Sequence, residues 1–89
     1  MTIPTLPPLP LEWREAGTRI SPRLACDCGT HRVAYLHKDG AYWEGYANGW
    51  DKAPDIPIHR SRSLDKAKAA AEAAAQAEWQ RFVNSMYGS

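Results

Sequence analysis

The amino-acid sequence predicts an α+β fold, namely a three- to four-stranded antiparallel β-meander with one C-terminal α-helix packed on one face. Three observations carry this prediction. Residues 63–84 form an alanine-rich run, residues 11–60 hold short aromatic segments separated by turn residues, and 89 residues suffice for one small core but not for two. We therefore expect a single small domain over residues 11–89, preceded by an arm over residues 1–10.

The arm contains four prolines in ten residues, which exclude a helix and disfavour a central strand. Ile3, Leu6 and Leu9 recur every three residues, as on one face of a polyproline-type helix. Two interpretations stay open: a disordered or loosely docked tail, and a polyproline segment that is bound in a partner's groove.

The strands are predicted from short runs of aromatic and branched residues between turn signals. Residues 11–15 alternate apolar and charged side chains, so we expect a first strand with Trp13 facing inward. Asp39-Gly40 and Asn48-Gly49 are turn pairs of the kind that join hairpin strands. Further strands are expected at 23–26, 32–37 and 41–47, with a short edge strand at 56–60.

The helix is predicted from the composition of residues 63–84, because alanine, lysine, glutamate and glutamine are all good helix formers. Ser63 is a favourable N-cap, Asp65 suits the first turn, and Gly88 follows the last plausible turn. Winding the run at about 100° per residue predicts an apolar stripe that packs on the sheet. Its members are Leu64, Ala67, Ala71, Ala75, Phe82 and Met86, with Trp79 at its border.

One helix covers one face of a small sheet, so the other face stays partly exposed. Period-two alternation places Tyr42 and Tyr46 on one face and Trp43 on the other. Exposed Tyr and Trp side chains are typical of protein interfaces. The predicted partner-binding residues are therefore Tyr42, Trp43, Tyr46 and Trp50.

Cys26, Cys28 and His31 place three metal-ligating side chains within six residues and are weak candidates for a zinc site. Structural zinc sites usually have two residues between the cysteines and a second ligand pair, and both are missing. We expect a turn with Cys26 facing inward, no metal and no cofactor. His31 and His37 are an even number of residues apart, so a regular strand would place both on the same side.

Catalytic motifs are missing from the sequence, which has no nucleophile elbow, Gly-rich phosphate loop or HExxH pattern. We therefore expect no catalytic residues and no enzymatic activity. The net charge is only +1, whereas proteins that bind nucleic acids or anionic membranes usually carry a clear excess of basic residues. No apolar run approaches about 20 residues and no signal peptide is recognisable, so a cytoplasmic location is expected. Monomer and homodimer both stay open, because an alanine-rich helix or an exposed sheet edge can pair with its own copy.

A basic cluster marks the N-terminus of the predicted helix, where backbone N–H groups and the helix dipole favour anions. The possible phosphate-binding residues are Arg60, Arg62, Lys66 and Lys68. The run from Ser63 to Ala71 resembles the start of the last helix of double-stranded-RNA-binding domains. In that family, lysines near this end contact phosphates, and a first helix without counterpart here enters the minor groove. This resemblance implies nucleic-acid binding as an alternative function.

The wider layout of residues 11–83 resembles small uncharacterised accessory proteins of bacteriophages and prophages. The likeness lies in the leading Leu-Glu-Trp-Arg strand, the short strands with Gly and Trp, and the closing Ser-Leu-x-x-Ala-Lys-Ala-x-Ala-Glu helix. It implies a protein made during infection, such as an inhibitor of host defence of the anti-CRISPR kind. The expected function is a non-enzymatic module in the host cytoplasm that occludes the surface of a host protein.

Overall fold

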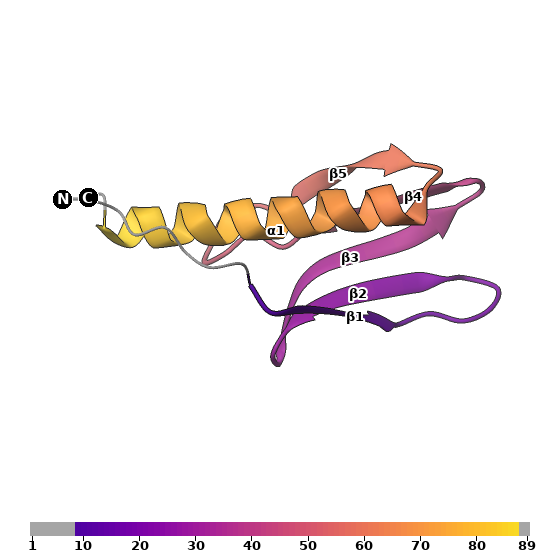
Figure 1. Ribbon diagram of the computed structural model, residues 1–89, viewed down its shortest axis with the longest axis horizontal. Coiled ribbons are helices and arrows are strands. Elements are labelled where there is room, and N and C mark those ends of the chain that lie inside the picture. The colour runs from indigo at the N-terminus through magenta and orange to yellow at the C-terminus, as the bar shows by residue number, and fades with distance from the viewer. Residues whose placement is uncertain (1–8, 88–89) are drawn as a thin grey trace.

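The computed structural model describes residues 9–87, which form a five-stranded sheet and one helix (Figure 1). The strands are β1 (Leu11–Glu15), β2 (Arg23–Cys28), β3 (His31–Asp39), β4 (Tyr42–Ala47) and β5 (Ile56–Ser61), and helix α1 spans Leu64–Tyr87. This is the predicted α+β class. The arm predicted over residues 1–10, apart from Leu9 and Pro10, and the helix stop at Gly88 lie outside the described residues.

The sheet is an antiparallel meander in the order β1-β2-β3-β4-β5. The expected three to four strands were too few, because the segment from Ile56 to Ser61 forms a full edge strand on β4. Pro57 fits there, since an edge strand has one side on which a backbone N–H is not needed for the sheet. Gly29 and Gly40 take φ values of 65° and 62° in the tight turns on either side of β3, a region that glycine enters without steric cost.

Helix α1 begins as predicted at its N-cap, because the backbone N–H of Lys66 donates to Ser63 Oγ at 3.3 Å. The helix packs on β3, β4 and β5, where the methyl groups of three alanines allow the helix backbone to approach the sheet closely. The buried core contains Cys26, Val33, Ala34, Leu36, Ala47, Ile58, Ala67, Ala71 and Ala75.

The C-terminal half of α1 differs from the predicted apolar stripe. Met86 is 57% exposed rather than packed, whereas Val83 and Glu78 are buried. Glu78 lies three residues after Ala75 and so continues the stripe geometrically, although its charge argued for solvent. The loop between β4 and β5 provides the partner that makes its burial possible, because the backbone N–H of Trp50 donates to Glu78 Oε1 at 3.1 Å.

The β1 side of the sheet extends past the helix, and its covered-face side chains are only partly buried. Trp13 packs against the core as predicted, and Lys68 Nζ lies 5.8 Å from the centre of its ring. A register shift in the β2–β3 pairing leaves Val33 as an extra residue, because Cys26 pairs with Ala34 and Asp27 with Arg32.

Candidate functional site

Helix α1, the one helix of residues 9–87, covers one face of the sheet and leaves the opposite face uncovered (Figure 1). The uncovered face carries a row of large side chains. The antiparallel register pairs Tyr35 with Tyr46, His37 with Glu44 and Asp39 with Tyr42. We call this surface the open face. By this register it consists of Glu12, Arg14, Arg23, Ala25, Asp27, Arg32, Tyr35, His37, Asp39, Tyr42, Glu44, Tyr46, Pro57 and Arg60, with Arg62 stacked at its border.

Stacked side chains occupy the end of the open face near the β2–β3 turn. The rings of Tyr35 and Tyr46 are stacked with centroids 5.7 Å apart, and the Tyr35 ring is 6.2 Å from that of His37. The guanidinium of Arg32 lies 5.3 Å from the centre of the Tyr35 ring, and its Nη2 donates to the Tyr46 hydroxyl at 3.4 Å. These lateral contacts order the half-buried rings of Tyr35, His37 and Tyr46, which point away from the core.

Glu44 links this aromatic end to a basic end of the same face. One carboxylate oxygen of Glu44 lies 3.2 Å from His37 Nε2 and the other 3.1 Å from Arg60 Nε. The Arg60 guanidinium is also 4.0 Å from an oxygen of Asp39 and 4.5 Å from the centre of the Tyr42 ring. Arg62 approaches that ring to 5.2 Å. Two guanidinium groups therefore converge on one tyrosine.

The four predicted partner-binding residues are divided among three places. Tyr42 and Tyr46 lie on the open face, and Trp43 lies on the helix-covered face, as the alternation predicted. Trp43 packs against the core, with Lys38 Nζ 6.0 Å from its ring centre. Trp50 lies in the β4–β5 loop against the C-terminal half of α1.

Trp50 makes internal contacts that attach its loop to the helix. Its ring stacks on His31 at 4.8 Å between centroids and lies 4.9 Å from Trp79 and 5.8 Å from Phe82. The side chain of Glu78 accepts the Trp50 N–H, and Arg81 Nη2 donates both to Glu78 Oε1 and to the Trp50 carbonyl. The Arg81 hydrogen bond, with that from Trp50, holds the pKa of Glu78 below its usual value despite burial.

The four predicted phosphate-binding residues do not form one cluster. Arg60 and Arg62 meet at Tyr42 in β4, whereas Lys68 lies over Trp13 in β1. Two strands separate β1 from β4, so these sites are about 14 Å apart across the sheet. Lys66 is exposed in the first turn of α1, where its own N–H is already bonded to the N-cap.

Cys26 and Cys28 lie at the end of β2, and His31 lies at the start of β3. Cys26 faces the core as predicted, and burial raises the pKa of its thiol to about 11, with smaller contributions from Glu72 and Asp27. Cys28 pairs with His31 in the sheet, and both thiols are free. Within residues 9–87, no three His, Cys, Asp or Glu side chains gather in a way that could hold a metal ion.

The expectation that His31 and His37 share one side was wrong. The extra residue at Val33 reverses the alternation along β3, so His31 reaches Trp50 on the covered side while His37 joins the open face. Sequence reasoning also missed Arg32 and Glu44 as members of the surface. The Asp39-Gly40 turn sets the β3–β4 register, and pairing outward from that turn would have placed Glu44 opposite His37.

Comparison with known proteins gave no match to a protein-family model, to a curated protein or to a solved structure. Across residues 9–87, no helix has both the length and the apolar character needed to cross a membrane.

Proposed function

We propose that this protein is a non-enzymatic binding module whose open face contacts a protein partner. The observation that carries this proposal is the row of Tyr35, Tyr46 and Tyr42, which is stacked with arginine guanidinium groups on the face opposite α1. Tyrosine and arginine are among the residues that contribute most to protein interfaces. Their lateral contacts reduce the entropy that they lose on binding, because the side chains are already ordered.

The charge pattern favours a protein partner over a nucleic acid. Arg14 is paired with Asp27 at 2.6 Å, and Arg60 is paired with Glu44. A phosphate backbone on this face would meet these carboxylates as well as the arginines, whereas a protein surface of mixed charge can pair with both signs. The open face therefore supports recognition of a mixed polar and aromatic protein surface.

The class of partner follows from the resemblance to phage and prophage accessory proteins. That resemblance supports a bacterial host protein as the partner, with binding at the open face blocking a functional surface of that protein. An inhibitor of a host defence system is the specific form of this proposal.

A photo-crosslinking experiment tests the proposal. A benzophenone amino acid is placed at Tyr42 in one variant and at Ala73, on the exposed side of α1, in the control. Both are incubated with bacterial host lysates. We expect the Tyr42 variant to crosslink a discrete protein that the Ala73 variant does not, and Tyr46→Ala to abolish that product while preserving the circular dichroism spectrum.

Two outcomes would count against this function. If neither variant, or only the Ala73 variant, gives a discrete crosslinked protein, the open face is not the binding surface. If instead duplex RNA or DNA binds at about 50 mM salt and Arg60→Ala with Arg62→Ala abolishes binding, the alternative nucleic-acid function is supported.

A further inference from the structure

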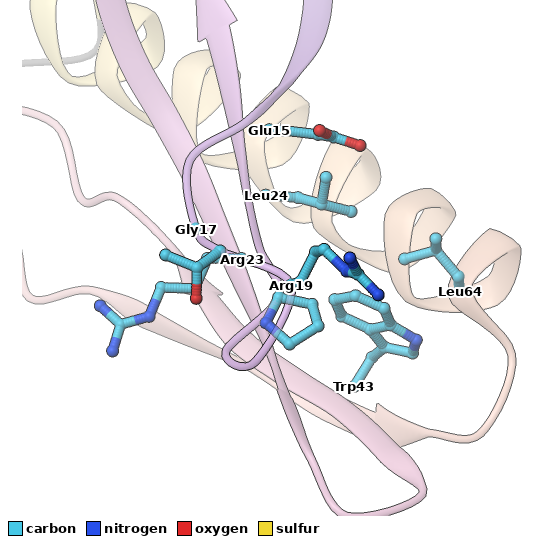
Figure 2. Close-up of a pocket in the computed structure, with 9 residues that line it drawn as sticks. Glu15, Gly17, Arg19, Arg23, Leu24, Trp43 and Leu64 are labelled. Atoms are coloured by element: carbon cyan, nitrogen blue, oxygen red, sulfur yellow. The ribbon is translucent and has the colours of Figure 1, made fainter.

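The helix-covered side carries a groove that the proposed function does not use. It has a volume of about 540 Å³ and lies between the β1–β2 loop, β4 and the first turn of α1 (Figure 2). Its apolar walls come from Pro22, Leu24, Trp43 and Leu64. Figure 2 shows the side chain of Arg19 extending toward Trp43 and that of Glu15 beside the helix, so that a positive and a negative group border the apolar space.

The β1–β2 loop, which borders this groove, exposes an isoleucine side chain to solvent. Ile20 is 97% exposed, the largest exposed fraction among the large apolar side chains of residues 9–87. The loop around it is fixed by two hydrogen bonds, from Thr18 N–H to the Ser21 carbonyl and from Ser21 N–H to Thr18 Oγ1, each 3.1 Å long. Gly17 packs so closely that a Cβ would collide with the backbone of Ser21. An ordered loop thus presents Ile20 outward.

We infer that the groove is occupied by a second copy of this chain, with Ile20 of each copy inserted into the groove of the other. A two-fold interface requires the same surface patch to be complementary to itself. Here one loop supplies an exposed apolar side chain, and the adjacent groove supplies an apolar space of sufficient size. In such a dimer, each Ile20 side chain enters one groove, and each groove receives one Ile20 side chain.

The charges at the groove are complementary in the same way. Among the described residues, neither Glu15 nor Arg19 takes part in an ion pair within one chain. Arg19 adjoins Ile20 in the loop, and Glu15 borders the groove that the partner's loop enters, so we expect Arg19 of each chain to approach the partner's Glu15 in this dimer. This crossed pairing of opposite charges favours a second copy over an occupant of a single charge.

The dimer is expected to be weak, because two loops and two grooves bury less than a standard interface. Its dissociation constant should lie at about 10 µM to 1 mM. The groove and the open face lie on opposite sides of the sheet, so the inference does not depend on the proposed function. Dimerisation would leave both open faces accessible.

Sedimentation equilibrium of the full chain at about 150 mM salt tests the inference. Between about 10 µM and 2 mM protein, we expect the average mass to rise from 9.9 kDa toward twice that value. Ile20→Ser should fold normally because the side chain is exposed, and it should raise the dissociation constant about 100-fold because two apolar contacts are lost per dimer. Met86→Ser, which removes an exposed apolar side chain from the other end of α1, is the matched control and should leave dimerisation unchanged.

A charge-exchange cycle tests the geometry of the same contact. Glu15→Arg and Arg19→Glu should each weaken the dimer, because each places like charges together across the axis. The double variant restores the opposite pairing and should dimerise more tightly than either single variant. The inference is overturned if the chain is monomeric at 2 mM, if Ile20→Ser dimerises like the unaltered chain, or if the double variant is the weakest.

Discussion

The two faces of the sheet achieve order by different means. The covered face uses small side chains, and Ala67, Ala71 and Ala75 bring the helix backbone close to the sheet, where Ala34 and Leu36 are fully buried. The open face uses large side chains that contact one another along the sheet through stacked rings and ion pairs. Burial between layers provides the larger part of stability, whereas lateral contacts order a surface that stays accessible.

Adjacent residues of β3 allow the sharpest test of this difference. Leu36 is fully buried under α1, and the next residue, His37, lies on the open face. We expect Leu36→Ala to reduce the free energy of unfolding by about 2–5 kcal/mol, since it leaves a cavity in a small core. His37→Ala should cost less than about 1 kcal/mol, because it removes one partly exposed contact with Glu44 and leaves no cavity between the layers. Equal losses in urea denaturation would contradict the division between the faces.

The close helix–sheet approach predicts a second effect of intermediate size. Ala71→Leu places extra methylene groups in a filled contact and should cost about 1–3 kcal/mol of unfolding free energy. Ala73→Leu is the matched control, because Ala73 is exposed on the same helix and leucine is nearly as good a helix former as alanine. If both variants are equally stable in thermal denaturation, the alanine stripe does not set the layer spacing.

The buried carboxylate of Glu78 predicts a pH-dependent contribution to stability. Its folded-state pKa is lowered by the hydrogen bonds from Arg81 and Trp50, so the contribution is complete above the unfolded-state pKa of about 4.5 and is lost as the pH falls through the lower folded-state pKa. Glu78→Gln should therefore cost about 1–2 kcal/mol at pH 7 and less at pH 3.

Urea denaturation of the unaltered chain and of Glu78→Gln at pH 7, 5 and 3 measures this difference. Arg81→Gln removes the strongest cause of the lowered Glu78 pKa. The unfolding free energy of this variant should therefore fall less between pH 7 and pH 3 than that of the unaltered chain. A stability difference that grows as the pH falls would show that the folded state prefers the protonated carboxyl.

Local patterns were sufficient to predict the helix, most of the strand positions and the split of Tyr42 and Trp43 between faces. Propensity and alternation act over a few residues, and in these segments tertiary packing agrees with them. The same logic failed at Glu78, whose burial depends on a backbone N–H from Trp50, 28 residues away in the chain. It also failed at His31, because alternation with a period of two assumes a regular strand, whereas β3 contains one extra residue.

The candidate site was predictable only in part for a related reason. Tyr42 and Tyr46 are conspicuous because aromatic residues alternate in one strand, but the partners that order them come from other strands. Arg32 reaches Tyr46, and Arg60 reaches Tyr42, only after the three strands β3, β4 and β5 are placed in register. Trp43 and Trp50 differ from these tyrosines in that they make internal contacts, with the core and with α1.

The smallest predicted effect lies on the open face itself. Tyr46→Ala removes the stacking partner of Tyr35 and should cost about 1 kcal/mol, since a surface aromatic pair contributes about 0.5–1.5 kcal/mol. Tyr46→Phe keeps the ring and loses only the 3.4 Å contact with Arg32, so its unfolding free energy should be nearly unchanged. Urea denaturation distinguishes the two. If Tyr46→Ala costs as much as Leu36→Ala, the open face acts as a second core, and its tyrosines are held for stability rather than for binding.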